Sequence, residues 1–292
     1  MDVEILNLYS NVAQPKTSLI GDHGQSFLIS TKDEKILFDV GTNGKKLLYN
    51  MKLLEVNPND ISLLILSHGH NDHTGGLPKF LESRTTDKIL PIIAHNDVLV
   101  PRRVKVAFYR KDAGFPKLTV KQKAKMKYDF KRTPQQITKY LRTTGEITER
   151  PYQQGIEPKL QWKNKEGNFE IDPVKDDTSL IITTKEGQVI VTGCAHAGIL
   201  NICKHAKDTS KIPIKAIFGG THMANYSIEE VYKTGEKFVN EFDNPDLYLN
   251  HCTDKLPVKL LKTTKVIDIL REKYGEKKIK NCYVGTKVTY TV

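Results

Sequence analysis

The residues best suited to chemistry lie in one short stretch, residues 63–78 (LLILSHGHNDHTGGLP). An apolar run ends there, and His68, His70, Asp72 and His73 follow within six residues. Side chains two apart in extended backbone point the same way, so His68 and His70 can converge on one point. His73 is close enough to Asp72 to hold a second ion beside the first. We therefore predict a metal site at the end of a strand.

Imidazole and carboxylate ligands suit Zn²⁺, with Mn²⁺ or Fe as alternatives, and this ligand set leaves open positions for water. Two such divalent ions can lower the pKa of a bound water from about 15.7 to roughly 7. They would also polarise an ester or phosphoryl oxygen as charge develops on it. In this mechanism Asp72 holds one ion and accepts a hydrogen bond from the water, so we expect an enzyme.

The elements that must position these residues follow from hydrophobic periodicity. Alternating or β-branched apolar runs predict strands at 3–9, 25–30, 35–40, 62–67, 90–95, 178–184, 188–193, 215–220, 246–250 and 282–290. Helical periodicity fits 45–55, 78–83, 197–206, 227–242 and 256–274. This order predicts an α/β fold in which two mixed sheets pack face to face with helices outside.

Length and composition are those of one globular domain of 292 residues, with a basic insertion at about 100–165. Between residues 101 and 140, thirteen Lys and Arg face two Asp, a surplus equal to the +11 charge of the whole chain. Such a segment attracts a phosphorylated small molecule or, as an alternative, nucleic acid. A solvated lysine-rich surface is the other interpretation.

No run of apolar residues approaches the roughly 20 that span a bilayer, and the first residues do not form a secretory signal. We therefore expect a cytoplasmic protein with no membrane partner. Its four cysteines contain no CxxC pair, which argues against a disulfide framework.

HGHNDH resembles the HxHxDH signature of the metallo-β-lactamase superfamily. That resemblance implies an αββα fold and adds three residues to the site. LFDVG supplies Asp39, which would orient the ligand loop from behind the ligands. VIVTGC places Cys194 at a ligand position where most members have Asp, and LYLNHC supplies His251 as the final histidine.

One family ligand is missing, because the histidine that the family normally has shortly before the strand predicted at 178–184 is absent here. Either a carboxylate among Asp172, Asp176 and Asp177 replaces it, or His196 of GCAHAG does; we favour His196. The predicted ligands of one ion are then His68, His70 and His196. Those of the other ion are Asp72, His73, Cys194 and His251.

A closer resemblance covers residues 21–253. GDHGQSFLI, LFDVG, SHGHNDHTGGL, TTGEI, TGCAHAGILNI, FGGTHM and HCT are similar to a subfamily of 7,8-dihydropterin-6-yl-methyl-4-(β-D-ribofuranosyl)aminobenzene-5′-phosphate synthases. The resemblance implies a condensation that releases pyrophosphate from a pterin substrate. The same fold also accommodates a phosphodiester hydrolase, a nuclease acting on RNA or DNA, or a non-catalytic metal-bound ligand sensor.

Two more histidines gain meaning from their positions. His222 follows a predicted strand and is expected to contact the substrate or its phosphate, with a catalytic role beside Asp72. His23, in the Gly-flanked GDHG loop, is expected to contact the substrate as well.

Overall fold

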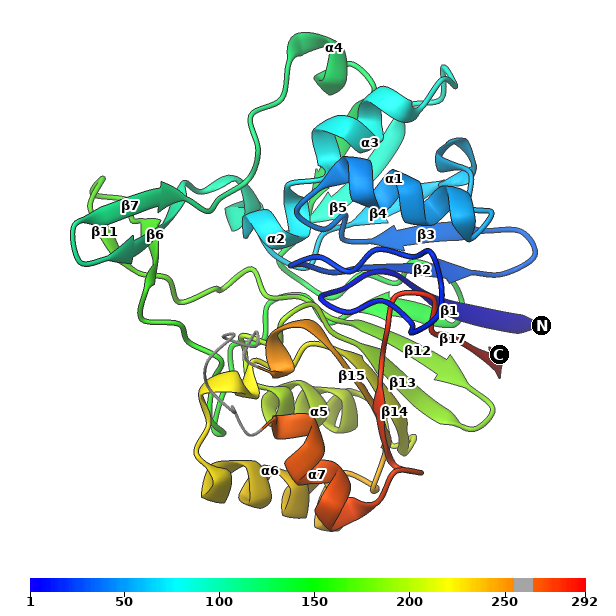
Figure 1. The fold of residues 1–292 in the computed structure, drawn as a ribbon, viewed down its shortest axis with the longest axis vertical. Helices are drawn as coiled ribbons and strands as arrows, with labels where there is room; N and C mark the ends of the chain where they lie inside the picture. Colours follow the sequence, from blue (N-terminus) through cyan, green and yellow to red (C-terminus); the bar gives the residue numbers. More distant parts are fainter. Residues whose placement is uncertain (255–264) are drawn as a thin grey trace. The chain divides into compact units, whose positions relative to one another are not determined.

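The computed structural model describes residues 1–254 and 265–292. These residues form two compact units. Unit 1 comprises residues 1–133, 156–176 and 283–290, and unit 2 comprises residues 134–155, 177–282 and 291–292. Each unit contains a sheet with helices against one face (Figure 1).

The main sheet of unit 1 has seven strands in the order β17-β1-β2-β3-β4-β5-β8. They are β1 (Asp2–Tyr9), β2 (Ser26–Ser30), β3 (Lys35–Phe38), β4 (Leu63–Ile65), β5 (Leu90–Ala94), β8 (Met126–Phe130) and β17 (Lys287–Thr291). β3, β4, β5 and β8 run parallel, whereas β1, β2 and β3 pair antiparallel. The parallel arrangement brings the carboxyl ends of β3 and β4, and the residues after them, to one edge of the sheet.

Two helices cover one face of this sheet, α1 (Gly44–Leu53) and α3 (Leu77–Ser83). Asn43 caps α1 by accepting hydrogen bonds from two backbone N–H groups of its first turn. Leu47 and Met51 of α1 and Phe80 of α3 pack against strand residues in one buried cluster. This packing fixes the backbone from which the histidine loop starts.

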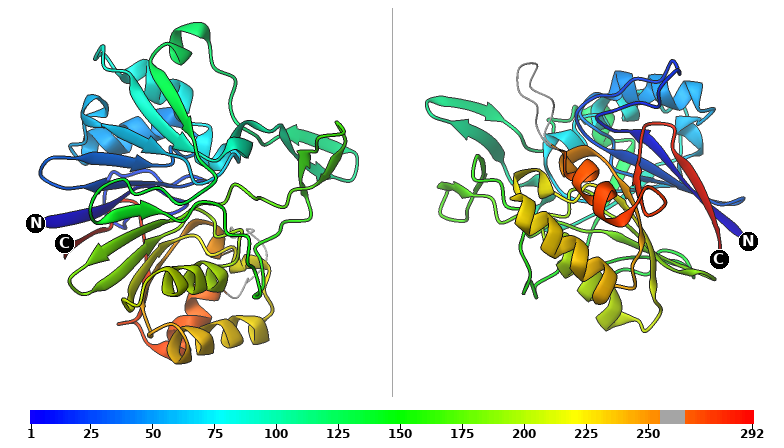
Figure 2. Two further views of the ribbon diagram at one scale, coloured as in Figure 1. Left: turned by 180° about the vertical axis from the view of Figure 1, so that it is seen from behind. Right: turned by 60° about the horizontal axis from the view of Figure 1, so that its bottom comes forward.

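The segment between the halves contributes to three sheets. β6 (Arg102–Val106), β7 (Tyr109–Asp112), β10 (Leu160–Lys163) and β11 (Phe169–Ile171) form a small antiparallel sheet in the order β11-β10-β6-β7. Figure 2 shows the hairpin of β6 and β7 extending as an arm from unit 1. Beyond it, α4 (Val120–Lys123) leads into β8 of the main sheet, and β9 (Leu141–Thr143) joins the sheet of unit 2. The sequence patterns had not predicted these strands.

The sheet of unit 2 has six strands in the order β16-β15-β14-β13-β12-β9. They are β9, β12 (Leu180–Thr184), β13 (Gly187–Val191), β14 (Ile214–Gly219), β15 (Asp246–Leu249) and β16 (Ile279–Asn281). The last four in chain order run parallel. Between them lie α5 (Ile199–Thr209), α6 (Ile228–Asn240) and α7 (Val266–Tyr274), whose apolar sides pack on one face of the sheet.

Most predicted elements are confirmed, with two exceptions. The predicted strand 282–290 is wrong: β16 ends before it and β17 begins within it. Gly285, at φ +93°, lies in the intervening turn. Of the predicted helix 256–274, residues 266–274 are helical and residues 256–264 lie outside the described residues. No helix in the described parts of the chain is long and apolar enough to cross a membrane.

Candidate metal centre

The histidine loop of unit 1 begins at the end of β4 and turns into the short helix α2 (Asn71–Thr74). His68 and His70 lie before this helix, and Asp72 lies within it. One ligand atom from each of His68, His70 and Asp72 lies within 4.8 Å of the others. The prediction that His68 and His70 converge thus has a geometric counterpart within unit 1, where Asp72, assigned to the second ion, lies beside them.

This donor set fits a divalent metal ion. Ligand atoms that share a zinc ion at about 2.0–2.2 Å lie at most about 4.4 Å apart, so the three need only small rotamer changes. Two imidazoles and a carboxylate are borderline and hard ligands, a combination that suits Zn²⁺, Mn²⁺ or Fe²⁺.

Asp39 holds the loop from the end of β3. Its carboxylate accepts hydrogen bonds from the N–H of Ser67 at 2.8 Å and from the Ser67 hydroxyl at 2.7 Å. It also lies 2.7 Å from Nδ1 of His73. Because a carboxylate can only accept, Nδ1 of His73 carries the proton and Nε2 has the lone pair that a metal would use. Asp39 itself has φ 62°, in the left-handed region.

His23 also lies beside the loop, with Nε2 3.3 Å from a carboxylate oxygen of Asp72. The hydrogen bond with Asp72 raises the pKa of His23, although burial acts in the opposite direction. The His23 side chain is half-exposed, so a ligand in solution could reach it.

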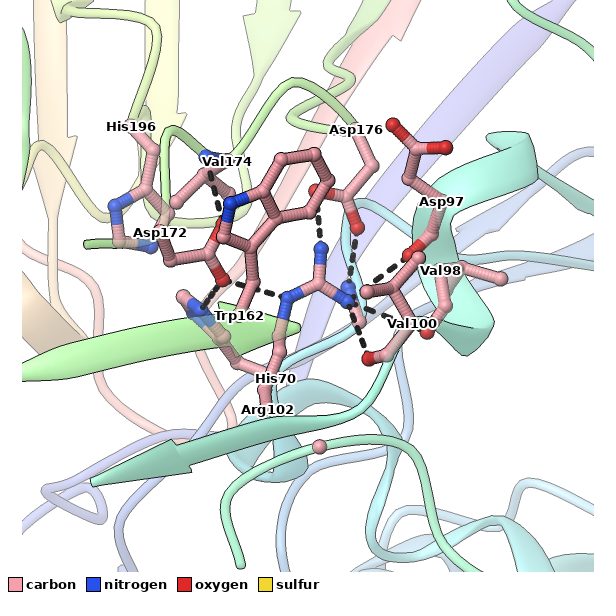
Figure 3. A network of polar contacts seen from close by, with 12 residues as sticks. His70, Asp97, Val98, Val100, Arg102, Trp162, Asp172, Val174, Asp176 and His196 are labelled. Atoms are coloured by element: carbon pink, nitrogen blue, oxygen red, sulfur yellow. Dashed lines mark hydrogen bonds and ion pairs between the residues drawn. The ribbon is translucent and has the colours of Figure 1, made fainter. Parts of the chain in front are cut away.

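Two of the three carboxylates considered as replacement ligands are bound to Arg102 (Figure 3). The guanidinium lies 2.7 Å from an oxygen of Asp172 and 2.7 Å from an oxygen of Asp176. Burial would raise the pKa of Asp172, but the hydrogen bond with His70 and the charge of Arg102 lower it to about 2. The third, Asp177, accepts from the N–H of Ala197 at 2.8 Å. All three carboxylates therefore have structural partners.

In unit 2, the remaining predicted residues follow the carboxyl ends of parallel strands. Cys194 follows β13, His222 follows β14 and His251 follows β15, so all three lie along one edge of the sheet. Ala195, His222 and His251 have φ values of 56°, 51° and 48°. Left-handed backbone at non-glycine residues is costly and often marks functional sites.

His196 is oriented by the main chain. Its Nδ1 lies 2.6 Å from the carbonyl oxygen of Gly155, so Nδ1 donates and Nε2 is the atom left for a metal. The rings of His196 and His222 lie 4.3 Å apart, centre to centre. A Cβ on Gly155 would lie 2.5 Å from the Cβ of His222, so only glycine fits beside this pair.

The sequence patterns had missed three supporting residues, Arg102, Ser67 and Gly155. Arg102 is one of the thirteen Lys and Arg residues of the basic segment, but its side chain is 1% exposed. Lys125 is also a structural cation, because its ammonium donates to the carbonyls of Leu81 and Arg84 at the end of α3. No sequence pattern distinguishes a buried arginine from the exposed cations of a basic segment.

Comparisons with known proteins agree with this geometry. The family model of the metallo-β-lactamase superfamily matches residues 19–206. The 7,8-dihydropterin-6-methyl-4-(β-D-ribofuranosyl)-aminobenzene-5′-phosphate synthase of Methanocaldococcus jannaschii is 32% identical over 273 residues, 86% of this chain and 88% of that protein. Exodeoxyribonuclease WalJ of Streptococcus pneumoniae is 33% identical over only 57 residues, 20% of this chain and 21% of its own.

Among solved structures, Tm1679, a metal-dependent hydrolase of the β-lactamase superfamily, aligns with a TM-score of 0.79. It is 25% identical, and the alignment covers 98% of both chains. The metallo-β-lactamase fold protein YhfI from Bacillus subtilis aligns over 99% of this chain and 100% of its own, with a TM-score of 0.56 and 13% identity. Since the family model covers well over half of the chain and one relative is 32% identical over most of both, this chain belongs to the metallo-β-lactamase superfamily and has its mixed-sheet α/β fold.

Proposed function

We propose that this protein is a two-metal enzyme that acts on a phosphorylated, pterin-related small molecule. The observation that carries the proposal is the relationship, over 86% of the chain, to a protein named as a dihydropterin ribofuranosylaminobenzene phosphate synthase. The convergent donor atoms of His68, His70 and Asp72 support a metal-dependent reaction.

The proposed ligands of one ion are His68, His70 and His196. Those of the other are Asp72, His73, Cys194 and His251. Neutral imidazoles that donate through one nitrogen to a fixed acceptor keep the other nitrogen ready for a metal. His73 and His196 both have such an acceptor, in Asp39 and in the carbonyl of Gly155. A thiolate from Cys194 adds a ligand that favours zinc.

When bound, such ions would polarise a phosphoryl oxygen and stabilise the negative charge that develops on a leaving group. The residues of the chain would do the rest. His222 would bind a phosphate of the substrate, and His23 would donate to Asp72 or to the substrate from the loop after β1. Asp39 would hold His73 and Ser67 in place from behind the ligands.

A phosphodiester hydrolase is the second candidate, because Tm1679, which aligns over 98% of the chain, is described as a metal-dependent hydrolase. A nuclease has weaker support, since the similarity to exodeoxyribonuclease WalJ covers 20% of the chain. The exposed lysines of the basic segment suit a phosphorylated metabolite as well as a nucleic acid.

The first test counts metal. Elemental analysis of untagged protein should give close to two transition-metal ions per chain, and His68→Ala should lose about one. His205→Ala is a matched control, since His205 is a half-buried helix histidine that the proposal assigns to no ion. A wild-type protein without metal at these residues would refute the two-metal proposal.

The second test separates the reactions. Pyrophosphate release from a dihydropterin pyrophosphate, with little turnover of bis(p-nitrophenyl) phosphate, would support a synthase. Slow phosphodiester cleavage that is lost in Asp72→Ala would support the hydrolase instead. In either case His222→Ala should raise KM; a fall in kcat at unchanged KM would make His222 a transition-state residue. Rapid RNA or DNA cleavage would overturn both, and ligand binding without turnover would indicate a sensor.

A further inference from the structure

We propose that Arg102 is a positioning residue for the metal-ligand loop, and that it acts through Asp172 and Asp176 to fix His70 and Gly69. The inference rests on the proposed function in one respect, the role of His70 as a ligand. It adds a residue from the basic segment whose task is to orient the loop, with no contact to the substrate.

Arg102 is the first residue of β6, and its guanidinium is almost fully buried in unit 1. Nε donates to Asp172 and Nη2 donates to Asp176, both at 2.7 Å. Nη1 donates to the carbonyls of Asp97 at 3.1 Å and Val98 at 3.4 Å, in the short turn after β5. The planar fork is thus engaged on all sides, which leaves it one orientation (Figure 3).

Both carboxylates also contact the ligand loop, at two adjacent residues. The Asp172 oxygen that binds Arg102 also lies 3.1 Å from Nε2 of His70. The second oxygen of Asp176 accepts the N–H of Gly69 at 2.8 Å. One guanidinium therefore positions two successive loop residues, each through a single carboxylate.

The contact with Asp172 decides which nitrogen of His70 can bind a metal. Asp172 is ionised beside Arg102, so it can only accept, and Nε2 of His70 must carry the proton. The lone pair is then on Nδ1. Asp172 also accepts the N–H of Val174 at 2.9 Å, which fixes its own rotation. Arg102, Asp172 and His70 form the cation–carboxylate–imidazole chain that sets both the tautomer and the ring orientation.

Gly69 supplies independent support for a tight fit. A Cβ at this position would overlap both Nη1 of Arg102 and the carbonyl oxygen of Val98. The residue between His68 and His70 is therefore glycine because the guanidinium packs directly against the loop backbone.

A stability role alone does not explain this cluster. Buried ion-pair clusters can often be replaced by apolar side chains without loss of stability, because desolvation offsets the attraction. A charge network that is costly to bury, and that ends on a metal ligand, is better explained by orientation of that ligand.

The test compares Arg102→Lys with Arg103→Lys in the purified full-length protein. Arg103 is the next residue of β6 and contacts Gln161 and Phe169, so it is a matched control. ¹⁵N-histidine NMR of the metal-free protein should show His70 protonated at Nε2 in the wild type and in Arg103→Lys. Arg102→Lys should give a mixture of tautomers. Zinc affinity, measured by chelator competition, should fall about 10- to 100-fold in Arg102→Lys alone.

Asp172→Asn is a second variant in case Arg102→Lys folds poorly, because it removes the acceptor charge and keeps the arginine. It should shift the His70 tautomer and lower zinc affinity to a similar extent. An unchanged His70 tautomer in both variants, with zinc affinities within about twofold of wild type, would overturn the inference.

The tautomer measurement needs neither metal nor turnover, so it separates this inference from the proposed function. A protein that turns over no pterin substrate but loses the Nε2 tautomer in Arg102→Lys would refute the function and support the positioning role.

Discussion

His70 and His73 of unit 1 donate to carboxylates, whereas His196 of unit 2 donates to a main-chain carbonyl. The unit 1 loop is reached by charged side chains from three other segments, at Asp39, Asp172 and Arg102. In unit 2 the corresponding residues depend on backbone shape, with left-handed φ at Ala195, His222 and His251.

This difference predicts which kind of substitution should disturb the site residues of each unit. A carboxylate partner raises the basicity of its imidazole and can be removed by one substitution. A main-chain carbonyl remains as an acceptor whatever side chain its residue carries, but its position depends on the backbone conformation. Unit 1 should therefore respond to charge changes, and unit 2 to changes in glycine or in backbone conformation.

The largest effect is expected from Asp39→Asn. Asparagine tolerates the left-handed φ of 62° at this position, so the change removes charge with little strain. An amide has one acceptor oxygen where the carboxylate has two, so one of the hydrogen bonds from His73 and Ser67 must be lost or weakened. Zinc affinity should then fall about 10- to 100-fold. Isothermal titration or chelator competition measures it.

Asp243→Asn is the control, since Asp243 is an exposed aspartate with φ 65°. It accepts the N–H of Ile214, and neither residue is among the predicted ligands. Equal zinc affinities in Asp39→Asn and Asp243→Asn would show that the Asp39 carboxylate does not support metal binding in unit 1.

A smaller effect is expected from Gly155→Ala, which probes the backbone-held half. The φ of Gly155 is outside the left-handed region, so alanine fits its backbone, but the new Cβ would displace His222. KM for a phosphorylated substrate should rise about tenfold, the cost of weakening one charge-assisted hydrogen bond.

A double variant sharpens this prediction. His222→Gly removes the Cβ that Gly155→Ala would meet, and glycine adopts φ 51° without strain. Adding Gly155→Ala to His222→Gly should then change KM little further. If the effects of the two substitutions on KM were fully additive, Gly155→Ala would not act through its contact with His222.

The smallest effect is expected outside both ligand sets, at the exposed lysines Lys121, Lys123 and Lys127. Lys125 is left intact because it caps α3. Neutralising the three to Gln should raise KM about threefold at low salt, through loss of long-range attraction. The effect should vanish near 1 M salt, where the Debye length is about 3 Å.

The matched control neutralises three other exposed lysines, so that net charge falls equally. These are Lys32, Lys211 and Lys277. If both triple variants behave alike, the basic segment is a solvated surface and has no steering role.

Much of the fold was predictable because many of its strands and helices have a clear apolar periodicity. β1, β5, β12 and α6 fall within a few residues of their predicted bounds. The strands at 102–112 and 160–171 were missed, since charged residues such as Lys105, Arg110 and Lys111 hide the alternation. That residues 1–292 form a single domain stays a prediction.

The sequence by itself determined which residues are predicted to bind metal. Histidines two apart at a strand end, with Asp72 and His73 in the next turn, are enough to predict metal ligands, because side-chain direction in extended backbone depends only on local geometry. Only the tertiary structure decided which residues orient them. Asp172 contacts His70 and Asp176 contacts Gly69 from 102 and 107 residues away, and Arg102 binds both carboxylates. Partners so distant in sequence are set by strand pairing and burial, which no local pattern encodes.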